Sequence, residues 1–450
     1  MKNLFLIATC LTLFAPLADA QQAAPPAQPY NFSLADCIKY AYEHQSAVKN
    51  ANLDVTSADY KVKETTGIGL PQVNGSASLQ DYIKIPTTLI PAEVFGGPAG
   101  TFIPLKFGVK YQSSVGLDVN QIIFSGSYLV GLKASKTYKE LSLRSLTRTK
   151  IQTNVAVTKA YYQVLVSNEQ IRLLDANLAQ LKQQFDQTTA QNKQGVVELI
   201  DVQRLEVQYN NLVTNRENTI RMLGLGYEML KFQMGMPIEN ELILKDKLED
   251  IKLDQNVAEN AVDTSFYHKR IEFNLSETNK TLNELDLKRQ KSQFLPSLSA
   301  NGNLTSSYQN DAFSDLYKMN FPSSFIGLKL NVPIFNGFQR RYQVKESEIT
   351  VLESQNNLNN LKNSINLEAK TANVNYVNGI QSLNNQKRSR ELAAEVLRVT
   401  KIKYQQGVGS SIEVTQAQTA LESADNQYIQ ALYDALVNKV NLDQAYGRIN

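Results

Sequence analysis

Four segments of the chain alternate between apolar and polar residues, which is the pattern of a β-strand with one apolar face. They span residues 72–79, 109–120, 297–305 and 326–334. Each covers about ten residues, the length of a strand that crosses a membrane in a β-barrel. A soluble sheet with one wet face has the same alternation, so the strands alone leave both structures open.

Aromatic residues lie near the ends of these segments. In a membrane barrel such residues form girdles at the two lipid–water interfaces. The positions concerned are Tyr82, Phe107, Phe124, Tyr308, Phe321, Phe325 and Phe335. Together with the signal peptide described below, they favour membrane strands over a soluble sheet.

The remaining apolar positions follow helical spacing. Residues 33–66 form a predicted helix with Ser33 as its N-cap. Residues 127–193 contain no proline and carry apolar residues three and four apart, as in a coiled coil. A helix of about 65 residues is roughly 100 Å long, so it must pack along other long helices. The expected core positions are Ile151, Val155, Tyr162, Leu165, Leu174, Leu178, Leu181 and Phe185.

Gly195 and Gly407 interrupt the two longest helical tracts, and each is followed by a short turn and another helix. Glycine readily adopts the positive φ that reverses the chain at a helix end. We therefore expect two helical hairpins with their turns at these glycines.

The chain is internally duplicated. Landmarks in the first half return in the same order in the second half, at separations of 211 to 225 residues. They pair Pro71 with Pro296, Gly116 with Gly327, Gly195 with Gly407 and Gly235 with Gly447. Such a repeat predicts two similar units, each with strands and a helical hairpin.

The repeat and the composition together define the expected organisation. The N-terminus has a positive Lys2, an apolar run and an Ala-x-Ala site, as in a secretory signal peptide. We assign residues 1–20 to the signal peptide, 21–32 to a flexible lead, 33–235 to the first repeat, 236–262 to a linking insertion and 263–450 to the second repeat. The connection 85–108 is rich in glycine and proline and is expected to be a surface loop.

Composition narrows the class of protein. The net charge of +3 argues against a nucleic-acid partner. After the signal peptide no apolar run is long enough for a transmembrane helix. One cysteine remains, Cys37, which cannot form an internal disulfide and is expected in the core.

No pattern indicates catalysis. The chain has two histidines and lacks the C-x-x-C, H-E-x-x-H, G-x-S-x-G and P-loop motifs. We therefore expect no enzyme activity, no metal site and no cofactor.

The whole order of elements resembles the TolC family of outer-membrane efflux proteins, also called outer membrane factors. The residues that carry the resemblance are Leu117–Gly126, Leu328–Gly337, Gly195–Asp201, Gly407–Glu413 and Leu442–Gly447. The resemblance implies an α+β membrane protein in the outer membrane of a Gram-negative bacterium. Three copies would form a 12-stranded β-barrel in lipid and a helical tunnel in the periplasm.

The resemblance also implies partners and a gate. The tips of the hairpins would meet a periplasmic adaptor, driven by an inner-membrane transporter of the RND, ABC or MFS class. The expected adaptor contacts are Gly195, Val196, Val197, Gly407, Val408 and Gly409.

Family members narrow the tunnel with acidic residues behind the second tip. Glu413 occupies the first of these positions, and Gln416 occupies the second, which weakens the expected cation selectivity. Tyr404 and Asp201 match residues that hold the tips closed, whereas Gly409 replaces a basic partner. A favourable interaction with the helix dipole would by itself explain Asp201 and Glu413, so that reading stays open.

The leading hypothesis is a passive exit duct for efflux or type I secretion. The alternative is a periplasmic or secreted coiled-coil scaffold without a pore. The sequence does not define the exported substrate or the class of transporter.

Overall fold

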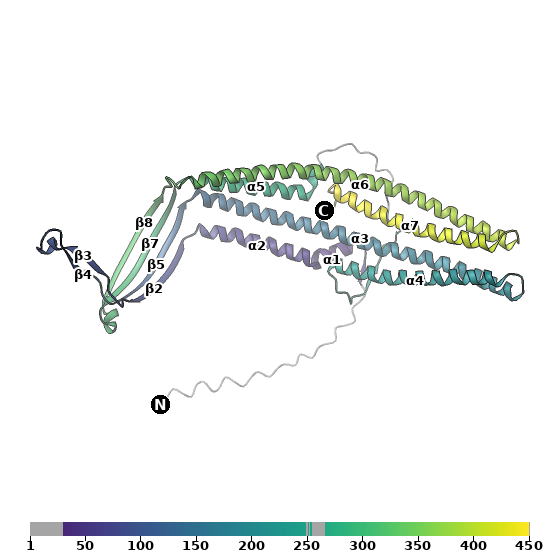
Figure 1. Cartoon of the computed structure of the whole chain (residues 1–450), viewed down its shortest axis with the longest axis horizontal. Helices are drawn as coiled ribbons and strands as arrows, with labels where there is room; N and C mark the ends of the chain where they lie inside the picture. The colour runs from purple at the N-terminus through teal and green to yellow at the C-terminus, as the bar shows by residue number, and fades with distance from the viewer. Residues whose placement is uncertain (1–29, 249–250, 252, 254–265, 450) are drawn as a thin grey trace, which may run out of the picture.

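The computed structural model describes residues 30–248, 251, 253 and 266–449. The molecule is elongated, with a β-sheet at one end and the turns of two helical hairpins at the other (Figure 1). The expected signal peptide, most of the expected lead and part of the 236–262 insertion lie outside the described residues. Within the described part of the chain, no helix combines the length and apolar character needed to cross a membrane.

One four-stranded antiparallel sheet joins the two repeats, in the order β2-β5-β7-β8. The strands are β2 (Gln72–Asp81), β5 (Tyr111–Phe124), β7 (Ser297–Asn310) and β8 (Asn320–Asn331). The central pairing, β5 with β7, crosses from one repeat to the other and places Leu117 opposite Leu304. All four predicted strands are therefore confirmed, and they form a single layer (Figure 1).

The predicted alternation gives the sheet one apolar and one polar face. The register places Val73 beside Val119, Leu117 beside Leu304, and Gly302 beside Ile326 on the apolar face. On the polar face, Asn303 Nδ2 donates to Asp118 Oδ1 at 2.7 Å, and the hydroxyls of Ser78 and Ser114 lie 2.9 Å apart. The apolar face is open, and Ile326 is 93% exposed.

The strand ends and one connection differ from the prediction. The second strand begins only at Tyr111, so Val109 lies outside it. The fourth strand stops at Asn331, so Val332 and Ile334 lie outside it, because its partner β7 begins only at Ser297, after Pro296. The predicted 85–108 loop contains a second sheet, the hairpin of β3 (Thr87–Pro91) and β4 (Phe102–Lys106). A one-turn 3₁₀ helix, η1 (Ala92–Phe95), connects its strands. The hairpin projects beyond the far end of the main sheet (Figure 1).

The two predicted helical hairpins are confirmed. The first consists of α3 (Gly126–Lys193) and α4 (Leu199–Met234), and the second of α6 (Gln339–Gln405) and α7 (Ser411–Ala445). Helix α3 packs on α7, so the two hairpins lie side by side. The shorter helices α2 (Ser46–Ile68) and α5 (Ile271–Ser292) flank the sheet-proximal part of α3. Helices α2, α3, α5 and α6 therefore lie together near the sheet. Toward the tips, the two hairpins continue beyond α2 and α5 (Figure 1).

The predicted helix 33–66 is two helices, α1 (Leu34–His44) and α2, which meet at Gln45. Ser33 is the N-cap as predicted, and it forms a capping box with Asp36. The break has a tertiary cause. Gly235, at the end of α4, packs so tightly there that a Cβ on it would lie 2.7 Å from Gln45 Cα and 2.8 Å from the His44 carbonyl oxygen.

The second repeat shows the equivalent contact. Gly447, at the end of α7, lies against the turn between η3 (Phe266–Lys269) and α5, where a Cβ would be 2.9 Å from the Lys269 carbonyl oxygen. Arg270 at that turn donates from Nη1 to the Ala445 carbonyl oxygen at 3.0 Å. In both repeats, the returning helix is thus anchored at the start of the short helix.

The largest core cluster lies at this level, midway along the molecule. It includes Cys37, Val157, Tyr161 and Leu436, each with at most 1% of its surface exposed. Cys37 is thus a core residue as expected. Of the expected α3 core positions, Val155, Tyr162, Leu165, Leu174 and Leu181 are buried, whereas Ile151, Leu178 and Phe185 are partly buried.

A short parallel pairing closes the core from one side. Strand β1 (Tyr30–Phe32) pairs with β6 (Leu242–Leu244) from the insertion. The last three residues of the expected flexible lead are thus a strand. Asp246 lies beside this pair, where its Oδ2 accepts hydrogen bonds from Tyr161 Oη at 2.8 Å and Leu34 N at 2.9 Å.

Candidate functional site: the tips of the helical hairpins

The two hairpin turns have the same backbone geometry. Gly195 and Gly407 have φ of +76° and +74°, in the left-handed region that glycine favours. The amide of Val196 donates to the Gln191 carbonyl at 3.0 Å, and that of Val408 donates to the Lys403 carbonyl at 3.1 Å. Each turn is therefore a Schellman motif, as the glycine positions predicted.

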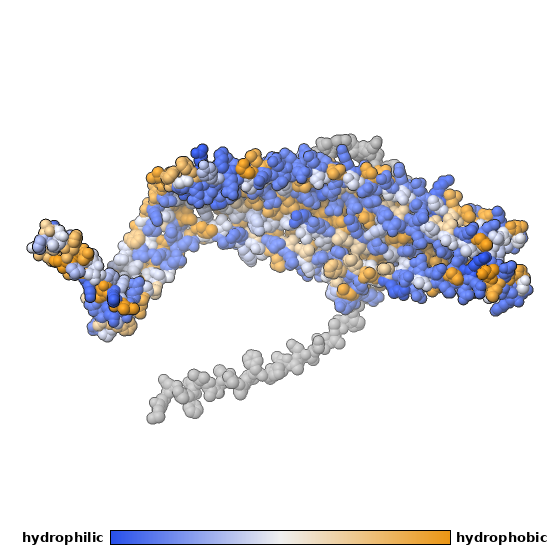
Figure 2. Space-filling model, in the orientation of Figure 1, coloured by the Kyte–Doolittle hydropathy of each residue, from blue (hydrophilic) through white to orange (hydrophobic). Residues whose placement is uncertain are grey.

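Apolar side chains are exposed at both turns. Val196 is 69% exposed at the first tip, and Val408 is 79% exposed at the second. Leu199, Ile200 and Ile412 lie on the first turns of the returning helices and are also exposed. Figure 2 shows hydrophobic residues at the end of the molecule where the tips lie. Exposed apolar groups therefore gather at both tips.

Side-chain hydrogen bonds join the two hairpins near the tips. Asp201, in the first turn of α4, accepts a hydrogen bond from the Ser411 hydroxyl at the start of α7. The same Asp201 oxygen lies 3.2 Å from Arg204 Nη1. One turn further, Gln208 Nε2 donates to the Thr415 carbonyl at 3.3 Å. Asp201 therefore does two things: it lies at the N-terminus of α4, where the helix dipole favours it, and it bonds to the second hairpin.

Tyr404 faces the other side of the same junction. It makes no hydrogen bond with Asp201. Burial, and to a lesser extent the charge of Asp201, raise the pKa of the Tyr404 hydroxyl, whereas the side chain of Thr188 on α3 lowers that pKa. Gly409 lies against this residue, since a Cβ there would be 3.0 Å from Tyr404 N. The predicted Asp201 and Tyr404 thus share one junction.

Glu413 and Gln416 are both exposed on the first turns of α7. The amide of Glu413 donates to Ser410 Oγ at 3.3 Å, as in a helix N-cap. Neither side chain forms a hydrogen bond or an ion pair within the described residues. They are placed to face solvent beside the tips.

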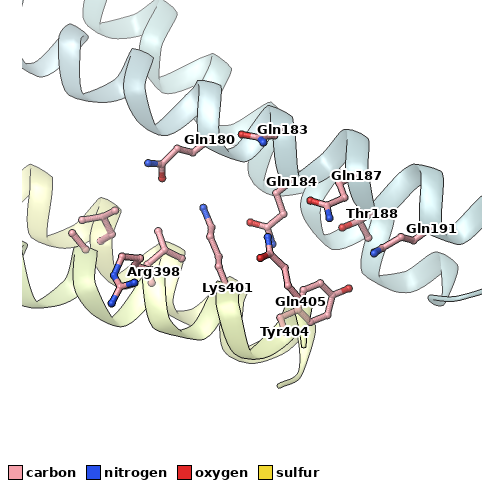
Figure 3. Close-up of a pocket in the computed structure, with 13 residues that line it drawn as sticks. Gln180, Gln183, Gln184, Gln187, Thr188, Gln191, Arg398, Lys401, Tyr404 and Gln405 are labelled. Carbon is pink, nitrogen blue, oxygen red and sulfur yellow. The ribbon is translucent and has the colours of Figure 1, made fainter. Parts of the chain in front are cut away.

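A groove between α3 and α6 leads to the tips, with a volume of about 320 Å³. One wall is a stripe of polar side chains on α3, namely Gln180, Gln183, Gln184, Gln187, Thr188 and Gln191. From the other wall, Lys401 on α6 points toward these glutamines (Figure 3). Burial lowers the pKa of Lys401. The Gln184 Oε1 atom is buried and accepts no hydrogen bond within the described residues.

A buried polar cluster joins the hairpins further from the tips. Asn177 on α3 donates to Asp425 on α7, and Arg390 on α6 donates to the other oxygen of that carboxylate. This cluster, the Ser411 bond and the glutamine groove were not among the features predicted from the sequence. The glutamines recur at helical spacing, so the stripe was visible in the sequence. Ser411 and Asp425 carry no comparable signal.

Comparison with known proteins identifies the family. The profile of the outer membrane efflux protein family matches residues 37–219 and 284–448, which cover most of both repeats. The chain belongs to this family. Its members are outer-membrane channels, and this protein accordingly lies in the outer membrane, with its helices extending into the periplasm.

Individual relatives are distant in sequence but share the fold. The outer membrane protein TolC of Salmonella enteritidis is 24% identical over 353 residues, covering 75% of this chain and 70% of TolC. The structure of CusC superimposes with a TM-score of 0.74 at 17% identity, covering 93% of each chain. The CmeC outer membrane channel of Campylobacter jejuni gives a TM-score of 0.73 at 17% identity, covering 92% of this chain and 85% of CmeC.

Proposed function

We propose that three copies of this protein form a passive exit duct through the outer membrane, docked on a periplasmic adaptor and an inner-membrane transporter. The observation that carries the proposal is the four-stranded sheet with one open apolar face and two unpaired edges, β2 and β8. Backbone groups at such edges cannot remain unpaired in lipid. Pairing β2 of one copy with β8 of the next satisfies them, and three copies supply a closed 12-stranded barrel.

The helices support a tunnel below the barrel. A single chain has two hairpins side by side, and within the described residues neither packs against a third hairpin on its outer flank. In a threefold assembly, each hairpin would have another hairpin on both sides. The six hairpins would form a tube with nearly sixfold symmetry. The tube would continue the barrel lumen across the periplasm.

The tips supply the adaptor surface in this proposal. Val196 and Val408 expose apolar side chains, and the polar groove beside them can accept a helix from a partner. The adaptor contacts would be the predicted tip residues, from Gly195 to Val197 and from Gly407 to Gly409. The transporter would belong to the RND, ABC or MFS class.

The gate in this proposal combines a latch and a charge. The Asp201–Ser411 bond would hold the hairpins together in the closed state, with Tyr404 packed beside it. The exposed carboxylate of Glu413 would give the entrance its cation preference, and the neutral Gln416 would limit it.

A direct test uses the purified protein in detergent, with native mass spectrometry for the trimer and planar bilayers for pores. Ile326→Arg on the apolar face of β8 should cost about 2–4 kcal/mol at the bilayer midplane and prevent membrane insertion. Ser323→Arg, on the polar face of the same strand, is the control and should insert. A monomer that leaves the cell envelope without detergent and forms no pores would instead identify a scaffold.

Adaptor docking has its own test. Val196→Glu combined with Val408→Glu should abolish export in cells, while the purified variant still forms trimers and pores. Normal export by this variant would remove the tips from the docking surface.

A further inference from the structure

The β3–β4 hairpin has no counterpart in the second repeat and carries a feature that the exit duct alone does not explain. Both of its faces are apolar. Register places Leu89, Pro91, Phe102 and Pro104 on one face, where Leu89 is 62% exposed and Phe102 is 60% exposed. Apart from each other, β3 and β4 pack closely against no other element of the described chain. An isolated two-stranded hairpin is at best marginally stable in water, so this one needs a partner.

The turn of the hairpin adds to the exposed apolar surface. Val94 and Phe95 in η1 are 69% and 63% exposed. Figure 2 shows hydrophobic residues on this projection, beyond the end of the main sheet. The exposed groups therefore extend from the strands to the tip.

A second exposed apolar group lies at the same end of the sheet. The connection between β7 and β8 contains η4 (Phe313–Lys318), where Phe313 and Tyr317 are 55% and 58% exposed. Met319, immediately before β8, is 61% exposed. This connection packs on the ends of β5 and β7, because Phe313 lies edge-on against Tyr111, and Tyr317 lies edge-on against Tyr308.

The topology of the sheet brings these two groups together between copies. Strands β2 and β8 are the two edges of the sheet, and β2 runs directly into the hairpin while β8 follows directly from η4. Closing the barrel places β2 of one copy beside β8 of the next. The hairpin of the first copy then stands next to the η4 connection of the second.

We propose that the β3–β4 hairpin of each copy docks on the η4 connection of its neighbour, so that three hairpins form an intermolecular collar around the outer mouth of the channel. The partner is a second copy of this chain. The inference rests on the proposed trimer, because the contact is continuous with the β2–β8 interface. Burying Leu89 and Phe102 against Phe313 and Met319 would remove these side chains from water and stabilise the assembly.

Cysteine cross-linking tests the collar in the outer-membrane fraction and in the purified trimer. The native Cys37 is a suitable background, because it is fully buried and burial raises its pKa to about 12. The test variants are Leu89→Cys with Phe313→Cys, and Phe102→Cys with Phe313→Cys, treated with a short bismaleimide. The control pair is Ser76→Cys with Ser323→Cys, both on the polar face of the sheet and on its two edge strands.

We expect the test pairs to convert most chains into covalent dimers and trimers, as the edge pair does. The edge pair cross-linking without either test pair would overturn the collar and leave the exit duct standing. The absence of trimers in native mass spectrometry, together with no cross-link in any pair, would overturn the exit duct itself.

Replacing residues 85–108 by a short turn gives a second readout. The collar predicts trimers that dissociate at a lower temperature but retain pores. Trimers of unchanged thermal stability would overturn it. In that case a fluorophore at position 89, quenched by lipid-borne quenchers, would identify the membrane surface as the partner of the hairpin.

Discussion

Asn177 on α3 and Asp425 on α7 are 248 residues apart in sequence, yet their side chains share a buried hydrogen bond of 2.6 Å. The other oxygen of Asp425 accepts from Arg390 Nε on α6, also at 2.6 Å. One carboxylate thus links both helical hairpins. In a buried position such a group is stabilising only while every partner is present.

Removing this carboxylate should loosen the packing of the hairpins. Asp425→Ala takes the partner from both Asn177 and Arg390, and we expect a loss of about 2 kcal/mol in the free energy of unfolding. Thermal unfolding followed by circular dichroism measures it. Asp434→Ala is the control, since Asp434 is exposed on the same helix and accepts a hydrogen bond from Gln430 one turn away. Equal losses in the two variants would contradict a specific role for Asp425.

The bond between Ser411 and Asp201 should bias the tips toward the closed state. Ser411→Ala removes the hydroxyl that joins α7 to α4, and we expect about 1 kcal/mol less stabilisation of the closed state. Single-channel recordings should then show more frequent or longer openings. Ser423→Ala, on an exposed turn of α7, should leave the openings unchanged.

The four repeat glycines should differ in their tolerance of alanine. At Gly407 an added Cβ meets nothing within 4 Å, so only the positive φ matters and Gly407→Ala should cost about 1 kcal/mol. At Gly447 the Cβ would also press on the Lys269 carbonyl, so Gly447→Ala should cost about 2–4 kcal/mol. Urea unfolding of the two variants compares them. A smaller loss of stability in Gly447→Ala than in Gly407→Ala would show that the contact between Gly447 and Lys269 can shift without cost.

The half-buried carboxyl of Glu422 should make stability depend on pH. Burial raises its pKa, opposed by Gln418 and assisted by the charge of Asp425. A raised pKa means that the folded chain holds the proton more tightly than the unfolded chain does. This contribution to stability is therefore fully present below the unfolded pKa and declines as the pH rises through the folded pKa.

Glu422→Gln removes the ionisable group and should raise the unfolding temperature at pH 7.5. The gain should shrink as the pH is lowered to 4, where Glu422 is already protonated. Glu346→Gln, at an exposed position on α6, is the matched control. The same gain at both pH values would assign the effect to something other than the titration of Glu422.

Glu413 should set part of the ion selectivity of the pore. Glu413→Lys reverses the charge of an exposed side chain at the second tip, so the preference for cations should fall. Reversal potentials in a salt gradient measure that preference. Glu43→Lys makes the same change of charge on α1, far from the tips, and should leave selectivity unaltered. Unchanged selectivity in Glu413→Lys would reject this residue as the gate charge.

Much of the fold could be predicted because it depends on local patterns. Alternation identified all four strands of the main sheet, and Gly195 and Gly407 identified both hairpin turns. The split of the first helix at Gln45 could not be predicted, because its cause is the close approach of Gly235 from another helix. The β3–β4 hairpin was missed since its glycines and prolines are typical of an irregular loop.

The candidate site divides in the same way. The tip positions of Gly195 and Gly407 followed from the repeat, and Asp201 and Tyr404 followed from the family resemblance. The contact of Asp201 with Ser411 joins residues 210 apart. A serine at the start of a helix usually indicates only a cap, so nothing local pointed to this bond.

The sequence by itself determined the two periodicities and the glycine turns, because each depends on residues only a few positions apart along the chain. It also determined the repeat, because the same landmarks return in the same order 211 to 225 residues later. The tertiary structure alone decided which elements meet: β5 with β7, α3 with α7, and Asn177 with Asp425. These contacts join distant residues, and their stability comes from burial and hydrogen bonds that form only when the two repeats pack together.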